Sequence, residues 1–311
     1  MVYLGVDIGG TNVKMGLVED GNILKRVVFK TSKEVEKLVN DIYVNLNKLK
    51  KECQVEEVGG IGIGCPGIID VKNGVVDIAY NLGWQDIHLK ELLEEKTKLE
   101  VRLSNDANVA GFGETIYGEG RGYKNVIVLT LGTGVGGAII IDGKLYEGNR
   151  GKGAELGHTL LVKNGRKCTC GRRGCAETYV AASRFLKDAR HYALNSKGLL
   201  SQQVVDGDVH QIKCETVFNA ADQGDLGAKA IVDKYIENLG EFVMDMCNIF
   251  RPEMVILGGG MSYSGETFIS KLEDYCRERH FGFEFTPEVL LKTARLKNDA
   301  GLIGGACLFM N

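Results

Sequence analysis

The sequence contains no run of lysine and arginine and its formal net charge is −3, so neither a nucleic acid nor an anionic membrane is expected as a partner. No stretch approaches the ~18 consecutive apolar residues of a membrane span. The first strand-like segment, residues 2–8, follows no basic and apolar leader of a secretory signal. Low-complexity and linker-like segments are also lacking. These absences predict a cytoplasmic globular protein, and 311 residues suffice for two domains.

The nine cysteines do not form the pattern of a small disulfide-stabilised protein. Three of them, Cys168, Cys170 and Cys175, lie close together, and the other six are scattered along the chain. Scattered cysteines suit a reducing compartment, where thiols are kept as such. We expect these six to be small apolar core residues.

The three clustered cysteines form one set of ligands with His158, with spacers of nine, one and four residues. Four such ligands complete the tetrahedron of a structural zinc site and leave no position for water. A disulfide is one alternative, but the one-residue spacer between Cys168 and Cys170 would strain it. Buried reduced thiols are another, but the loop is rich in Gly, Lys and Arg. The pattern therefore predicts a zinc loop that positions the flanking Glu155 and Glu177 as a pair.

Apolar periodicity predicts alternating strands and helices. Helices are indicated at 33–51, 88–98 and 226–250, where apolar residues recur at intervals of three and four. The polar stretch Ser104-Asn105-Asp106-Ala107 predicts the start of a further helix. Apolar runs predict strands at residues 2–8, 13–18, 23–29, 58–64, 101–103, 126–131, 138–141 and 254–257.

The two halves of the chain open in the same way. A shift of 122 residues places Gly10 on Gly132 and Thr11 on Thr133, and it also aligns the hairpin turn after residue 19 with the turn after residue 141. A match that preserves both turns and their separation predicts duplication of a unit made of a strand, a glycine turn, a strand and a hairpin.

Glycine turns follow three of the predicted strands, at residues 9–10, 132–137 and 258–260. Without a Cβ atom, backbone N–H groups can approach a phosphate chain closely. One such turn alone is better explained as an ordinary hairpin. Two related copies and a third glycine run favour a nucleotide held between two similar halves. The sequence matches neither the Walker pattern nor the dinucleotide fingerprint.

Asp106 is the candidate general base, because it lies beside Asn105 at a helix start. The helix dipole favours its ionised form there, and a simple capping role is an equally weighted alternative. The single tryptophan, Trp84, lies three residues after Asn81. An aromatic ring near an amide suits a sugar, although an isolated tryptophan usually packs in a core.

With these residues assembled, the chain resembles the ROK family of sugar kinases, and within it the bacterial ATP-dependent glucokinases. The resemblance covers nearly the whole chain. It implies an α/β fold, the duplicated actin-like, hexokinase-like ATPase fold, with two domains around a cleft and a C-terminal helix that returns to the first domain. The implied domains are a small one, residues 1–113 with 297–311, and a large one, 114–296, with the zinc loop and the dimerisation surface. The motifs are Asp7-Ile-Gly-Gly-Thr-Asn12, Asn105-Asp-Ala-Asn108, Leu131-Gly-Thr-Gly134, Glu155-x-Gly-His158 and the cysteine loop through Glu177.

The resemblance also implies transfer of the ATP γ-phosphoryl group, with Mg²⁺, to the 6-hydroxyl of a hexose, glucose above all, with Asp106 as the base. His158 would bind zinc together with Cys168, Cys170 and Cys175, and would bind the sugar through its second nitrogen. The implied hexose-binding residues are Asn81, Asn105, Asp106, Glu155, His158 and Glu177. The implied Mg-ATP residues are Asp7, Gly9, Gly10, Thr11, Asn12, Lys14, Gly132, Thr133, Gly134, Gly258, Gly259 and Gly260.

Four features stay open at this level. N-acetylmannosamine, allose or fructose are alternative substrates, and polyphosphate is an alternative donor. Repressors of the family carry an N-terminal helix-turn-helix domain, for which a phosphate motif at residue 7 leaves no room, so a sugar sensor without activity is less favoured. A homodimer or homotetramer is what the family implies.

Overall fold

The computed structural model describes residues 1–204, 208–277 and 279–310. Contacts divide the chain into two compact units. The first comprises Met1–Lys124, Ala138–Ala154 and Arg295–Asn311, and the second comprises Asn125–Gly137 and Glu155–Ala294. This division assigns residues 114–124, 138–154 and 295–296 to the first unit, whereas the resemblance places them in the large domain.

The first unit is built on a five-stranded sheet in the order β3-β2-β1-β4-β8. The strands β1 and β2 are antiparallel, as are β2 and β3, whereas β4 pairs in parallel with both β1 and β8. The sheet is therefore mixed. Its strands are β1 (Val2–Ile8), β2 (Asn12–Glu19), β3 (Asn22–Lys30), β4 (Ile61–Cys65) and β8 (Val101–Asn105).

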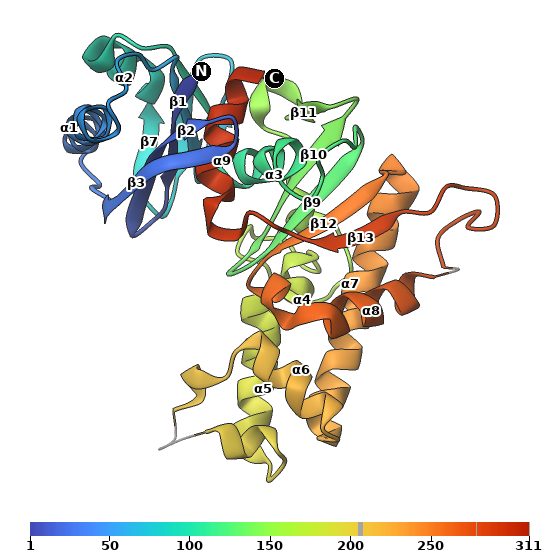
Figure 1. The fold of residues 1–311 in the computed structure, drawn as a ribbon. Coiled ribbons are helices and arrows are strands. Elements are labelled where there is room, and N and C mark those ends of the chain that lie inside the picture. The colour runs from blue at the N-terminus through green and yellow to red at the C-terminus, as the bar shows by residue number, and fades with distance from the viewer. Residues whose placement is uncertain (205–207, 278, 311) are drawn as a thin grey trace. The chain divides into compact units, whose positions relative to one another are not determined.

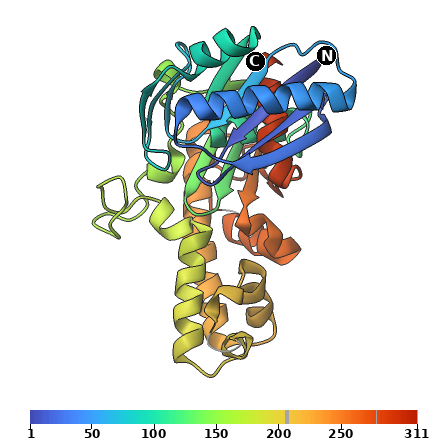
Figure 2. The same ribbon diagram turned by 90° about the vertical axis from the view of Figure 1, so that its left-hand side faces the viewer.

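Helices cover this sheet. Figure 2 shows α1 (Val35–Cys53) lying across it, next to α2 (Leu89–Thr97). The helices α3 (Asp106–Ile116) and α9 (Ala300–Cys307) pack against each other. The C-terminal helix α9 contacts β1 so closely that a Cβ atom added at Gly5 would lie 1.9 Å from the carbonyl oxygen of Leu302. The C-terminus thus returns to the first unit, as the resemblance implies.

A small three-stranded antiparallel sheet, which the apolar pattern does not predict, also belongs to the first unit. It consists of β5 (Ile68–Asp70), β6 (Val75–Ala79) and β7 (Trp84–Ile87). Trp84 at the start of β7 is only 3% exposed, and its indole N–H donates a 2.8 Å hydrogen bond to the carbonyl of Lys33. It is therefore a core residue and not an exposed platform for a sugar ring.

The second sheet repeats the order of the first, as β11-β10-β9-β12-β13. Again the later strands are parallel, β9 with β12 and β12 with β13, whereas β10 and β11 form an antiparallel hairpin. The repeated order confirms the duplication. The strands are β9 (Val126–Leu131), β10 (Val135–Ile141), β11 (Lys144–Tyr146), β12 (Met254–Gly259) and β13 (Leu290–Thr293).

The helices of the second unit are α4 (Glu177–Val180), α5 (Ala182–Asn195), α6 (Cys214–Asp222), α7 (Leu226–Phe250) and α8 (Gly265–Cys276). The long helix α7 has the predicted bounds, and α5 and α6 lie along it (Figure 1). Aromatic rings fill the space between these helices. Short 3-10 helices occupy Asn149–Gly151, Leu156–His158, Leu200–Gln203, Val209–Gln211, Gly260–Ser264, Lys297–Asp299 and Leu308–Met310.

Among the described residues, no helix combines the length and the apolar character that a bilayer crossing requires.

Candidate functional site

The glycine turn of the first unit joins β1 to β2 and is held by Thr31. The N–H of Gly9 donates to the carbonyl of Asn12 at 3.0 Å, and the Thr31 hydroxyl donates to the carbonyl of Gly9 at 2.6 Å. Next to the turn, the Lys14 ammonium lies 3.3 Å from a carboxylate oxygen of Asp7. These bonds fix the backbone of the turn.

Asn81 lies beside this turn. A Cβ atom added at Gly10 would stand 3.6 Å from the Cβ of Asn81, and Asn81 itself is exposed. The structure thus brings one predicted sugar-binding residue next to a predicted ATP-binding turn. The segment that carries Asn81 connects β6 to β7, so the small sheet is what positions it.

Asn105 and Asp106 stand where β8 becomes α3. The side-chain oxygen of Asn105 accepts the N–H of Ala107 at 2.9 Å, and its amide N–H donates to the carbonyl of Gly67 at 3.1 Å. Asn105 is therefore the N-cap, and Asp106 is the first helical residue. A carboxylate oxygen of Asp106 also accepts the N–H of Ala107, at 2.9 Å, which fixes its orientation. Capping of α3 thus has a dedicated residue besides Asp106.

Glu147, which the sequence analysis does not single out, accepts a hydrogen bond from the hydroxyl of the buried Ser104, one residue before Asn105. Ion pairs of Arg150 with Asp70 and of Lys152 with Asp77 hold the same segment. Burial raises the pKa of Glu147, and the hydrogen bond from Ser104 opposes this only in part. The segment is thereby tied to the strand that presents Asn105 and Asp106.

The raised pKa of Glu147 predicts how stability depends on pH. Because the folded state holds the proton more tightly than the unfolded chain, this group stabilises the fold at acidic pH. That contribution is lost as pH rises through the usual glutamate range near ~4.3 towards the raised pKa. Glu147→Gln, which cannot ionise, should therefore be more stable relative to the wild type at pH 7 than at pH 4. Urea unfolding at both pH values measures this. An equal difference at both values would contradict it.

The glycine turns of the second unit lie at neighbouring strand ends. The strands β9 and β12 are parallel with Gly259 opposite Leu131, so their carboxyl ends share one edge of the sheet. Gly259 has a φ of 77°, and a Cβ there would lie 2.4 Å from the carbonyl oxygen of Leu131. A residue other than glycine is excluded at this position by both conformation and space.

A cavity of about 580 Å³ opens at this edge, within the size range of small-molecule sites. Gly132, Thr133 and Gly260 are among the residues that line it. The first residues of α5 hold the turn: Ser183 donates its N–H to the carbonyl of Gly132 at 3.1 Å and its hydroxyl to that of Thr133 at 2.6 Å. Lining residues that the sequence analysis missed, because no motif marks them, are Ser183, Arg190, Lys213, Glu215 and Tyr263.

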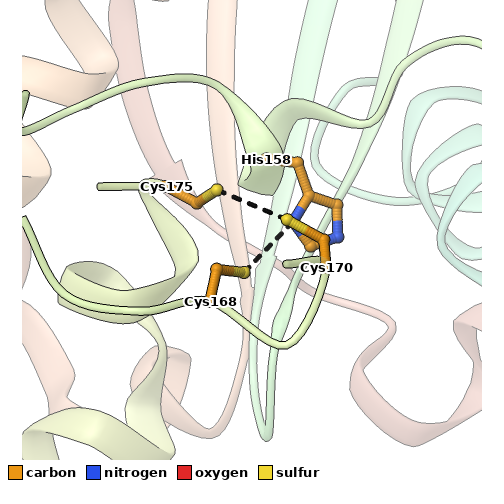
Figure 3. A group of neighbouring side chains, drawn as sticks. All are labelled: His158, Cys168, Cys170 and Cys175. Atoms are coloured by element: carbon orange, nitrogen blue, oxygen red, sulfur yellow. Dashed lines mark hydrogen bonds between the residues drawn. The ribbon is translucent and has the colours of Figure 1, made fainter. Parts of the chain in front are cut away.

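His158 and the three clustered cysteines come together. Their ligand atoms all lie within 4.8 Å of one another (Figure 3). The sulfurs of Cys170 and Cys175 are 3.7 Å apart, and the sulfur of Cys168 is 3.6 Å from Nδ1 of His158. The backbone N–H of Arg172 lowers the pKa of Cys170, whereas desolvation raises that of Cys175 to about 12. All three are thiols without a disulfide.

Glu177 joins this thiol cluster to the glycine turn between β9 and β10. One of its oxygens accepts the N–H of Val135 at 3.1 Å, and the other lies 3.8 Å from the sulfur of Cys168. A Cβ added at Gly134 would be 2.4 Å from the first oxygen, so the carboxylate occupies the space that the glycine leaves. A side chain at position 134 would therefore displace the Glu177 carboxylate as well as any phosphate bound at the turn.

Glu155 is exposed just before the 3-10 helix Leu156–His158. That helix packs on β10, where a Cβ at Gly157 would lie 2.3 Å from the carbonyl oxygen of Val135. The carbonyl of Glu155 accepts the N–H of His158 at 3.0 Å. The same turn thus carries Glu155 and presents His158 to the cysteines.

Two mixed sheets of the same strand order, with glycine turns at the strand ends and a cavity beside those of the second unit, are the architecture of the actin-like, hexokinase-like fold. Within this class the chain belongs to the ROK family, whose model matches residues 3–311.

Three relatives illustrate the likeness. A glucokinase of Halalkalibacterium halodurans is 36% identical, over 98% of this chain and 94% of its own length. A glucokinase of Thermotoga maritima is 38% identical, over 98% of this chain and 96% of its own. The crystal structure of a ROK family glucokinase from Streptomyces griseus, in complex with glucose and AMPPNP, matches with a TM-score of 0.81 and 34% identity, covering 99% of each chain.

Proposed function

We propose that the protein is an ATP-dependent hexose kinase that phosphorylates the 6-hydroxyl of glucose. The observation that carries the proposal is the cavity of about 580 Å³ at the shared edge of β9 and β12, where glycine turns at two neighbouring strand ends leave room for a phosphate chain to approach the backbone. Similarity to glucokinases over nearly the whole chain supports glucose as the acceptor.

Asp106 is the proposed general base, which accepts the proton of the 6-hydroxyl as the phosphoryl group is transferred. The hydrogen bond from the N–H of Ala107 fixes the Asp106 carboxylate before substrate binds. The carboxylate therefore loses less orientational freedom when the reaction takes place. Phosphoryl transfer needs in-line positioning and compensation of charge more than covalent help. Asn105, held by its own two hydrogen bonds, would present the remaining amide N–H to a sugar hydroxyl.

The other hexose-binding residues in the proposal are Asn81 in the first unit and Glu155, His158 and Glu177 in the second. Ionised carboxylates only accept hydrogen bonds, so both glutamates would select hydroxyl donors. His158 turns Nδ1 to the cysteines, which leaves its other ring nitrogen for the sugar (Figure 3).

We also infer a structural zinc ion at the thiol cluster. In a tetrahedral site with Zn–S of about 2.3 Å and Zn–N of about 2.05 Å, two sulfurs are about 3.8 Å apart, and sulfur and nitrogen about 3.6 Å. The separations of 3.7 and 3.6 Å in the cluster match these edges. Bound there, zinc would hold the loop in shape, and His158, Cys168, Cys170 and Cys175 would fill its coordination sphere.

The proposed Mg-ATP site comprises two groups of residues. In the second unit, Gly132, Thr133, Gly134 and residues 258–260 would contact the nucleotide, and in the first unit the turn at 9–12 with Asp7 and Lys14 would contact its phosphates. A carboxylate such as Asp7 suits Mg²⁺, which prefers oxygen ligands and supplies charge compensation to the phosphates.

The same proposal includes two functional domains, which comprise residues 1–113 with 297–311 and residues 114–296. It also includes self-association as a homodimer or homotetramer. Exposed apolar side chains in the second unit support self-association, because large exposed apolar groups tend to mark interfaces. These are Ile249 at the end of α7 and Phe281 and Phe285, which are 67%, 86% and 88% exposed.

A panel of hexoses tests the substrate. We expect ATP-dependent phosphorylation of glucose, with weaker activity on 2-deoxyglucose and mannose, because a carboxylate that the bound sugar covers but leaves without its hydroxyl partner penalises the analogue. An assay of ADP release measures kcat/KM for hexoses and N-acetylhexosamines. If N-acetylmannosamine or allose exceeded glucose about tenfold, a preference of about 1.4 kcal/mol, glucose would be the wrong acceptor.

A further inference from the structure

Glu114 is a carboxylate that the proposed chemistry does not use, buried in the last turn of α3 with 2% exposure. Its oxygens accept three backbone N–H groups: that of Leu296 at 2.6 Å, and those of Arg295 and Glu119 at 3.1 and 3.2 Å. A negative charge near a helix C-terminus opposes the helix dipole, and a buried carboxylate is costly without partners. The hydrogen bonds from the three N–H donors offset the cost of burying the Glu114 carboxylate at this position.

The backbone around Glu114 is shaped to receive its carboxylate. A Cβ added at Gly118 would stand 2.0 Å from one of the Glu114 oxygens, so the carboxylate fills the space of a missing side chain. The N–H groups of Gly118 and Gly120 both donate to the carbonyl of Glu114 at 3.0 Å. The Arg295 guanidinium also donates to the carbonyl of Tyr117, at 2.6 Å. The backbone of both segments is therefore arranged around the Glu114 carboxylate.

The three donors lie next to two of the four points at which the chain passes between the units. The chain first leaves the first unit after Lys124, five residues after Glu119, and last re-enters it at Arg295, itself a donor. The same helix that carries Glu114 in its last turn begins with Asp106. One helix thus joins the proposed base to both of these segments.

We propose that Glu114 is a positioning residue for phosphoryl transfer, which fastens residues 119–124 and 295–296 to the helix that presents Asp106. The inference rests on the proposed function. Reaction requires the acceptor and donor atoms to approach within about 3–3.5 Å in line, and an error of about 1 Å can cost about a hundredfold in rate. Loosening these two segments leaves the binding side chains intact but lets the helix that presents Asp106 move out of line.

Two variants separate positioning from general stability. Glu114→Gln keeps the volume but places an NH₂ group where one carboxylate oxygen accepts N–H groups, so at least one bond becomes a clash between donors. Thr115→Val is the matched control. Thr115 is 3% exposed in the same helical turn, and its hydroxyl donates only to the carbonyl of Gly111 at 3.0 Å. Valine removes that bond without touching residues 119–124 or 295–296.

The experiment measures kcat and KM per folded molecule, together with amide hydrogen exchange of residues 119, 295 and 296. For Glu114→Gln we expect kcat to fall about 10- to 100-fold with both KM values within about twofold, and these amides to exchange faster. For Thr115→Val we expect unchanged kcat and unchanged exchange at these amides.

Unchanged exchange in Glu114→Gln would overturn the proposal, and so would faster exchange with a kcat equal to that of Thr115→Val, which indicates a structural role alone. A wild-type protein that phosphorylates no hexose would overturn the proposed function instead. In that case the exchange rates alone would test whether Glu114 anchors the two segments.

Discussion

Replacement of Asp106 by asparagine should lower kcat by about two to four powers of ten, the usual share of general base catalysis, while hexose binding persists. The amide oxygen of asparagine can still accept the N–H of Ala107, so the start of α3 keeps its hydrogen bond. What the amide lacks is the ability to take a proton from the attacking hydroxyl. The loss is therefore expected in kcat and not in the Kd for glucose.

The measurement pairs steady-state kinetics with glucose binding by calorimetry, which needs no turnover. Asp86→Asn serves as the control, because Asp86 is an exposed aspartate of the same unit whose removal changes the charge equally. If Asp106→Asn turned over at a near-normal rate, Asp106 would only support the helix start, a role that Asn105 already fills as the N-cap.

Features that depend on neighbouring residues were predictable from the sequence. The apolar period predicts the observed bounds of α7, Leu226–Phe250. This is possible because apolar residues that repeat every three to four positions can be read from the helix's own sequence. The 122-residue repeat likewise predicts the unit of strand, glycine turn, strand and hairpin that begins both sheets. The ligand spacing predicts the cluster of His158 with three cysteines, because a metal site needs particular atoms within a short loop.

Features that depend on partners far along the chain were not predictable. The short strands of the β5–β7 sheet carry too few residues for a clear period, although this sheet positions Asn81. Lining residues of the cavity at the edge of β9 and β12, such as Arg190 in α5 and Lys213 just before α6, come from segments that no motif marks. Glu114 contacts a segment 181 residues away. In the sequence alone, it cannot be distinguished from a glutamate on the exposed face of a helix. Tertiary contacts alone distinguish such residues.

Removal of one proposed zinc ligand should abolish metal binding and weaken hexose binding together. Cys170 is the ligand of choice because it is exposed, so Cys170→Ser leaves the core unchanged. Metal analysis should give about one zinc per wild-type chain and almost none in the variant. The KM for glucose should rise about tenfold to a hundredfold, since a hydrogen bond to a charged group contributes about 1.5–3 kcal/mol. Cys53→Ser, outside the cluster, is the control for loss of a thiol.

The expected weakening follows from the contacts of the loop. The cluster fixes the ring of His158 through Nδ1, and the sulfur of Cys168 lies 3.8 Å from Glu177, so both proposed sugar ligands depend on the loop's shape. Glu177 also keeps a bond to the N–H of Val135 that does not involve the cysteines. The KM for ATP should therefore change less than that for glucose. A metal-free Cys170→Ser protein with a normal KM for glucose would show that the thiol cluster plays no part in sugar binding.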